Sequence, residues 1–150
     1  MKNIENKKIP KIFLRESKNY VILNLTNHRA TPKQKKAGVI ELKPYDDTII
    51  KGCLTFDDIP TYKEMMRRIM LILEILEEYN CQMAMIGGAS FFMPILERVL
   101  LRSDILPVYA FSKRNSREVA QQDGSVKKQV IFDHLGFYSP FHQGPLPEAE

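Results

Sequence analysis

Polar side chains that can hydrogen-bond or exchange a proton follow directly after an apolar run near the start of the chain. Residues 20–23 are apolar, and Asn24, Thr26, Asn27 and His28 come next. Asn and Thr side chains can hydrogen-bond a base edge or a ribose, and an imidazole can act as a general acid or base. The pattern predicts a ligand site with an acid–base group. The alternative is an Asx-type turn that exposes a histidine.

A second candidate site lies where a strand predicted over residues 82–86 is followed by a helix predicted over residues 90–102. Two adjacent glycines let the backbone approach a ligand closely, and a helix start offers N–H groups to a phosphate. The segment is neither a P-loop nor a G-x-G-x-x-G dinucleotide motif. The alternative is simply a tight strand-to-helix connection. The residues concerned are Gly87, Gly88, Ala89 and Ser90.

A basic segment follows the strand predicted over residues 105–111. We interpret it as a loop that contributes Ser112, Lys113, Arg114 and Arg117 to the ligand site. An Arg guanidinium can hold a phosphate with two parallel hydrogen bonds. The alternative is a solvated loop with no ligand.

Metal and cofactor chemistry have little support in the sequence. His28, His134 and His142 lack the i, i+4 spacing of helical ligands, and there is no C-x-x-C motif or conspicuous acidic pair. Ser90 lacks the G-x-S-x-G context of a hydrolase nucleophile. We therefore predict no metal and no cofactor.

Two helix starts are marked in the sequence. Thr31 can cap a helix over residues 32–37 that begins with proline and is ended by Gly38. Thr61 and Glu64 have the spacing of a capping box, which predicts a helix over residues 61–79. Residues 45–60 have a mixed pattern that indicates one or two helical turns and a loop.

The helix over residues 61–79 is more apolar than a single sheet contact requires. Five apolar residues fall on one face, and four more widen it, which indicates contact with a second subunit or deep burial. The first set is Met65, Ile69, Ile72, Leu73 and Leu76, and the second is Met66, Met70, Leu71 and Ile75.

Strands alternate with helices along most of the chain. We expect strands over residues 20–26, 39–42, 82–86 and 105–111, and a hairpin that turns at Asp123-Gly124. This order predicts an α/β fold with three layers and a mostly parallel sheet, to which the C-terminal hairpin adds. Right-handed crossovers then bring the carboxyl ends of three strands to one rim.

Composition favours one soluble domain. The chain has 150 residues, 44% hydrophobic and 27% charged, and neither a membrane span nor a secretory signal is predicted. Two cysteines indicate a reducing, cytoplasmic location. We divide the chain into a basic extension (1–18), a domain (19–138) and a loose tail (139–150).

Charge is distributed unevenly along the chain. The first 36 residues hold ten Lys or Arg and two Glu, a net charge of +8, whereas the remainder carries −4. This asymmetry favours an anionic partner. A solvated basic tail is the alternative for residues 1–18.

Several segments together resemble the small CRISPR-associated ring nucleases of type III systems. They are NLTNH (24–28), TPKQ (31–34), PVYAF (107–111), Arg114, Glu118, DGSVKK (123–128) and FDH (132–134). The resemblance spans residues 20–138. It implies a CARF-like Rossmann domain, a homodimer and a cyclic oligoadenylate ligand, most often cyclic tetra-adenylate.

The resemblance also implies a metal-independent reaction in which a ribose 2′-OH attacks the adjacent phosphate and leaves a 2′,3′-cyclic phosphate. Such cleavage would switch off an antiviral defence signal. We expect catalytic roles for His28, Arg114 and Ser90. We expect ligand binding by Asn24, Thr26, Asn27, Gly87, Gly88, Ala89, Ser112, Lys113 and Arg117.

Three other functions remain open from the sequence. The same fold can bind or sequester a cyclic nucleotide without cleaving it, as a sensor or as a phage sponge that blocks host defence. It can process a linear RNA, or it can be a housekeeping nucleotide-binding protein. We expect neither a membrane nor a duplex nucleic acid as partner.

Overall fold

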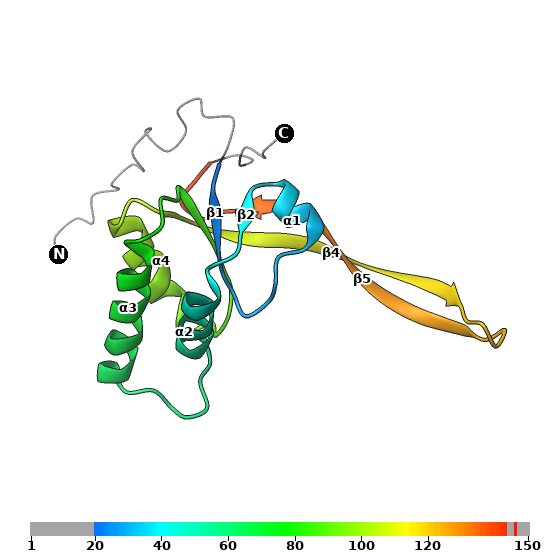
Figure 1. Ribbon diagram of the computed structural model, residues 1–150, viewed down its shortest axis with the longest axis horizontal. Coiled ribbons are helices and arrows are strands. Elements are labelled where there is room, and N and C mark those ends of the chain that lie inside the picture. Colours follow the sequence, from blue (N-terminus) through cyan, green and yellow to red (C-terminus); the bar gives the residue numbers. More distant parts are fainter. Residues whose placement is uncertain (1–19, 144–145, 147–150) are drawn as a thin grey trace.

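The computed structural model describes residues 20–143 and 146 and contains one five-stranded sheet (Figure 1). The strand order is β2-β1-β3-β4-β5. The first four strands in this order are mutually parallel, and β5 is antiparallel to β4. The strands are β1 (Ile22–Leu25), β2 (Val39–Ile40), β3 (Met83–Ile86), β4 (Leu106–Ala120) and β5 (Val126–Tyr138). The mixed α/β fold, the mostly parallel sheet and the C-terminal hairpin are thus confirmed. The predicted extension over residues 1–18 lies outside the described residues.

Four helices accompany the sheet in the part of the chain that the structure describes. They are α1 (Pro32–Lys36), α2 (Pro44–Leu54), α3 (Tyr62–Leu76) and α4 (Met93–Arg102). Helices α2, α3 and α4 lie together on one side of the sheet, and the short α1 lies on the other (Figure 1). The larger core cluster packs between the three helices and residues such as Leu23, Ala84 and Ile86. A smaller cluster on the opposite face includes Ile22 and Val108.

Both threonine caps form, but only one is a complete capping box. Oγ1 of Thr31 accepts from the backbone N of Gln34 at 3.2 Å, and Oε1 of Gln34 accepts from the backbone N of Thr31 at 3.0 Å. Oγ1 of Thr61 accepts from the backbone N of Glu64 at 3.2 Å. The Glu64 carboxylate binds Arg67 and Arg68 instead of returning to the cap. The predicted box at the start of α3 is therefore only half formed.

Helices α2 and α4 differ most from their predicted extents, and α3 ends at Leu76 rather than at residue 79. The predicted turns within residues 45–60 are an 11-residue helix, α2. Its first turn holds Pro44 and two Asp side chains, and both residue types favour a helix start. Helix α4 begins at Met93 rather than Ser90. The carbonyl of Ala89 accepts from the N–H groups of Phe92 (2.9 Å) and Met93 (3.3 Å), so the chain makes a turn before the helix.

The predicted basic loop after residue 111 is wrong, because β4 continues through it. Residues 112–120 pair with residues 126–134 in a ribbon that projects from the body (Figure 1), and we call residues 112–134 the arm. The expected Asp-Gly turn closes its tip, where Gly124 has a φ of +84° and the backbone N of Ser125 donates to Oδ1 of Asp123 at 2.9 Å. At the base of the arm the register shifts between Phe111 and Ser112.

The described part of the C-terminal tail packs on the smaller core cluster. Ser139 and Leu146 are buried, and Phe141 packs partly against the same cluster. This segment therefore covers a sheet face that helices α2–α4 leave open. Within the described residues, no helix has the length and apolar character needed to cross a membrane.

Candidate functional site

A pocket of about 340 Å³ opens at the carboxyl ends of β1 and β3. Strand β2 pairs with one edge of β1, and β3 pairs with the other edge. The connections from β1 to β2 and from β2 to β3 therefore run in opposite directions along the sheet, and the strand order reverses between β1 and β3. Open α/β sheets bind ligands in the crevice at such a switch point. We call this hollow the strand-end pocket. It is lined by Thr26, Asn27, His28, Arg29, Gln34, Met85, Ile86, Gly87, Gly88, Tyr109 and Ala110.

The structure thus brings five of the predicted site residues to one pocket. The loop after β1 contributes Thr26, Asn27 and His28, and the turn after β3 contributes Gly87 and Gly88. These two segments are about 60 residues apart in the sequence and become neighbours because β1 and β3 pair in parallel.

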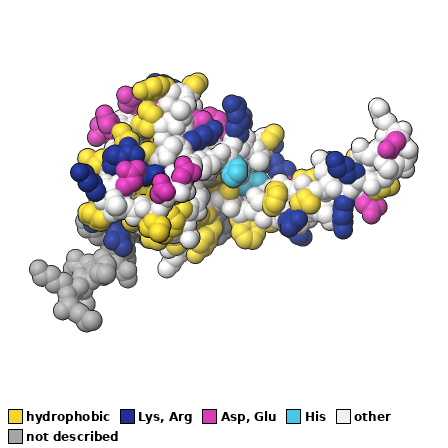
Figure 2. Space-filling model, turned by 90° about the horizontal axis from the view of Figure 1, so that it is seen from below, with side chains coloured by type: hydrophobic (Ala, Val, Ile, Leu, Met, Phe, Trp, Pro, Cys, Tyr) yellow, Lys and Arg dark blue, Asp and Glu magenta, His cyan; other side chains and the backbone are white. Residues whose placement is uncertain are grey.

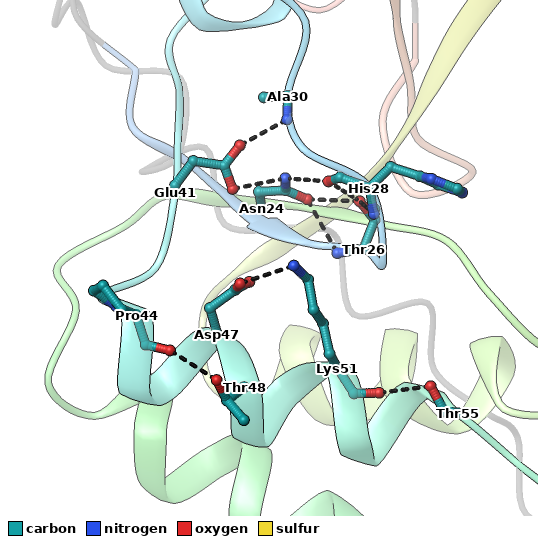
Figure 3. Close-up of polar contacts among 10 residues, drawn as sticks. All are labelled: Asn24, Thr26, His28, Ala30, Glu41, Pro44, Asp47, Thr48, Lys51 and Thr55. Carbon is teal, nitrogen blue, oxygen red and sulfur yellow. Dashed lines mark hydrogen bonds and ion pairs between the residues drawn. The ribbon is translucent and has the colours of Figure 1, made fainter.

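Asn24 is buried, 3% exposed, and its side chain is used within the protein (Figure 3). Nδ2 donates to the backbone oxygen of His28 at 2.8 Å and to Oε2 of Glu41 at 3.0 Å. Oδ1 accepts from the backbone N of Thr26 at 3.0 Å and lies 2.7 Å from its Oγ1. These contacts use both donors and both lone pairs of the amide. A ligand contact of Asn24 stays a prediction. The hydrogen bonds that its side chain makes in this structure hold the loop after β1 in place.

The loop after β1 is an Asx-type turn with an exposed histidine, which is the alternative that the sequence left open. The turn is closed by the contact from Thr26 N to Asn24 Oδ1. The backbone N of His28 donates to Oγ1 of Thr26 at 3.3 Å. The imidazole extends away from the Asn24 amide (Figure 3). It is therefore free to meet a ligand at the rim, although the turn itself requires no ligand.

Glu41 is a site-building residue that the sequence reasoning missed. Its Oε1 accepts from the backbone N of Ala30 at 2.6 Å, and its Oε2 accepts from Asn24. The carboxylate thus joins the residue after β2 to both ends of the loop after β1 (Figure 3). Glu41 falls inside the strand predicted over residues 39–42, so no signal in the sequence marked it as a site residue.

The two glycines of the turn after β3 differ in what they require. Gly88 has a φ of +147°, which side-chain-bearing residues rarely adopt, so this position needs glycine for its own backbone. Gly87 has no such φ, and a Cβ built there would lie 3.6 Å from Cγ2 of Thr26, an ordinary contact. The need for a tight strand-to-helix connection therefore explains the glycine at position 88. Gly87, in contrast, keeps the space between the two loops open.

The remaining predicted site residues lie outside the strand-end pocket. Ala89 and Ser90 belong to the turn before α4, and Ser90 does not cap that helix. Four others are exposed on the arm, where they face β5 partners rather than the pocket: Ser112, Lys113, Arg114 and Arg117. Figure 2 shows Lys and Arg side chains spread along the arm and histidines near the point where it leaves the body.

Two polar contacts fix the base of the arm. Lys33 on α1 forms an ion pair with Asp133 on β5. The hydroxyl of Tyr109 donates to Glu97 on α4. Burial, together with the Glu97 carboxylate, raises the pKa of Tyr109 above its ordinary value. This phenol is therefore held protonated beside the strand-end pocket.

The described residues offer few groups suited to metal binding or to thiol chemistry. Among residues 20–143 and 146, no three His, Cys, Asp or Glu side chains are grouped to hold a metal ion. Cys53 is buried and Cys81 is half-buried, and neither forms a disulfide. Burial raises the pKa of both thiols, which makes them poor nucleophiles at neutral pH.

Comparison with protein-family models matches residues 20–138 to the family described as "Uncharacterized protein MJ1673 family". The match therefore includes the whole sheet, the strand-end pocket and the arm. No curated protein and no solved structure matches the chain.

Proposed function

The chain belongs to the MJ1673 family, whose description names no activity, and we propose from the strand-end pocket that it binds and cleaves cyclic oligoadenylate. In this proposal the fold is a CARF-like Rossmann domain, and the ligand is a cyclic tetra-adenylate that acts as a type III CRISPR signal. The protein is then a cytoplasmic ring nuclease that ends the signal.

One observation carries the proposal, namely the pairing of two polar loops at the switch point of the sheet. The loop after β1 offers Thr26, Asn27 and Arg29, which suit ribose hydroxyls and phosphate. The turn after β3 offers close backbone approach at Gly87. Together they suit a phosphodiester backbone better than a compact apolar ligand.

The proposed reaction needs alignment more than a strong nucleophile. The 2′-oxygen forms a bond to the adjacent phosphorus while the bond from phosphorus to the 5′-oxygen breaks. The exposed imidazole of His28 accepts the 2′-OH proton, and the leaving 5′-oxygen takes up a proton from water. The products are a 2′,3′-cyclic phosphate end and a 5′-hydroxyl. The Asn24–Glu41 contact positions the loop that carries His28.

A homodimer completes this proposal. Arg114 and Arg117 project on the arm and do not line the pocket of their own subunit, so in this proposal they add to Arg29 at a bound phosphate from the partner subunit. Ser90 lies three residues after Gly87, outside the pocket of the free chain, and in this proposal its hydroxyl meets the part of the ligand that extends past that turn. Helix α3 supports a subunit contact, because Met70 is 65% exposed and shares its side with Tyr62 and Met66.

Binding without cleavage is the second candidate function. It is favoured by the Asx-type turn, which explains the Asn24, Thr26 and His28 pattern without any chemistry. In that case the protein is a sensor or a sponge for the same ligand.

The deciding experiment incubates the full chain with radiolabelled cyclic tetra-adenylate, with and without EDTA. Linear products that carry a 2′,3′-cyclic phosphate in both reactions support the ring nuclease. Saturable binding with an intact ring supports the second candidate. Neither binding nor cleavage, with linear tetra-adenylate and cyclic di-adenylate as matched ligands, overturns both.

A further inference from the structure

A second hollow of about 460 Å³ lies at the base of the arm, beside the strand-end pocket. The two hollows share Tyr109 and Ala110 as lining residues, so they adjoin along β4. The second hollow is lined largely by aromatic and aliphatic side chains, among them Phe111, Leu135 and Tyr138. A ligand that extends out of the strand-end pocket along β4 therefore contacts the second hollow.

Three of the four aromatic side chains that line this hollow lie on one face of the sheet, whereas the fourth, Phe137, packs against the smaller core cluster on the other face. Tyr109 and Phe111 are two residues apart on β4, and Tyr138 pairs directly with Tyr109 across the ladder. Phe111 is 62% exposed and Tyr138 is 61% exposed, which is unusual for large rings that sit side by side. We call Tyr109, Phe111 and Tyr138 the aromatic shelf.

The register shift at the arm base leaves an open place on the aromatic shelf. Gly136, with a φ of +152°, pairs with Phe111 and puts no side chain beside the Phe111 ring. Leu135 is the extra residue in the shifted register, and it bounds the other side of the hollow. Tyr109 is fixed from behind by its hydrogen bond to Glu97. The hollow therefore has space beside the Phe111 ring that no side chain of Gly136 fills.

We propose that the aromatic shelf stacks a purine base of the ligand whose phosphodiester backbone occupies the strand-end pocket; this inference rests on the proposed function. Base–aromatic stacking tolerates any base, because every base has a π face. It also explains why exposed rings line the hollow that adjoins the strand-end pocket. The polar pocket then holds sugar and phosphate, and the shelf holds the base.

The test uses cyclic tetra-adenylate in which one adenine is replaced by 2-aminopurine, whose fluorescence is quenched by stacking. With the parent chain we expect quenching on binding. Phe111→Ala should weaken binding about tenfold and lose most of the quenching. Phe111→Trp should restore both. The matched control is Phe132→Ala, because Phe132 is equally exposed at 64% but pairs with Arg114 on the opposite face of the arm.

The outcomes separate this inference from the proposed function. If the parent chain does not bind the probe, the proposed function fails and the base site fails with it. If the parent binds but Phe111→Ala and Tyr138→Ala both keep full affinity and quenching, only the base site is overturned. If Phe111→Ala instead lowers the mass seen by light scattering with quenching unchanged, the shelf is a subunit contact and the base site is likewise overturned. Circular dichroism of both variants verifies that they are folded.

Discussion

The amide of Asn24 and the carboxylate of Glu41 are joined by a 3.0 Å hydrogen bond that ties the end of β1 to the residue following β2. The same carboxylate also accepts from the backbone of Ala30, beyond the intervening loop. Two parallel strands and the loop at their ends are thus held by two side chains. These hydrogen bonds hold the polar loop after β1 in one conformation at the rim of the strand-end pocket.

We expect Asn24→Ala to lower the free energy of unfolding by about 1–3 kcal/mol, because it leaves the part-buried polar groups of Thr26, His28 and Glu41 without these hydrogen bonds. Urea denaturation followed by circular dichroism measures the change. Asn115→Ala is the control, because Asn115 is exposed on the arm. Equal stability of the two variants would show that the Asn24 contacts do not hold the loop.

Gly87→Ala should leave the protein folded and weaken cyclic tetra-adenylate binding at least tenfold. The added methyl meets only Cγ2 of Thr26 at 3.6 Å, so it fits the free protein but narrows the space between the two loops. Isothermal titration calorimetry gives the affinity. Gly52→Ala is the matched control, because a Cβ there has nothing within 4 Å. Full affinity in Gly87→Ala would move the ligand away from this turn.

His28→Ala should slow single-turnover cleavage by about two to four orders of magnitude and change affinity only a few-fold, if the imidazole accepts the 2′-OH proton. Cleavage by the variant at nearly the parent rate would restrict His28 to binding. In-line alignment and charge stabilisation alone would then have to drive the reaction.

The homodimer has its own test. Light scattering at tens of micromolar protein should give about twice the subunit mass of 17.4 kDa. Met70→Glu should shift the mass toward the monomer, because it puts a charge on the exposed side of α3. Arg98→Glu, at an exposed position of α4, is the control. A monomeric parent chain, with ligand present, contradicts the expected subunit contact.

Tyr109 should ionise at higher pH than an ordinary tyrosine. The difference in absorbance at about 295 nm between the parent and Tyr109→Phe should develop only above the ordinary tyrosine value of about 10. Below that value the phenol is protonated in both the folded and the unfolded chain. Above it the unfolded state loses its proton first, so the free energy of unfolding should fall more steeply in the parent. A difference signal centred at or below about pH 10 would contradict the buried contact with Glu97.

Local signals in the sequence predicted the elements that position the pocket. The apolar run before Asn24, the Thr31-Pro32 helix start and the Gly87-Gly88 turn each depend on nearby residues, and each is confirmed. The parallel pairing of β1 with β3 then brings their ends together, as α/β topology requires.

Long-range contacts account for what the sequence reasoning missed. The basic residues after Phe111 have loop-like composition, yet they extend β4 because each faces a partner on β5. Glu41 has no motif of its own, and its role exists only because β2 lies beside β1. Ser90 resembles a helix cap, but the Ala89 carbonyl makes a turn there and delays the start of α4.

The isolated ribbon of the arm has a consequence for amide hydrogen exchange. In a two-stranded antiparallel ladder, the N–H groups of alternate residues point outward and meet solvent on both edges. Exchange along residues 112–134 should therefore alternate between fast and slow amides, whereas the central strands β1 and β3, with neighbours on both sides, should exchange slowly throughout. An arm that loses this alternation when ligand or a second subunit is added has acquired a further strand at its edge.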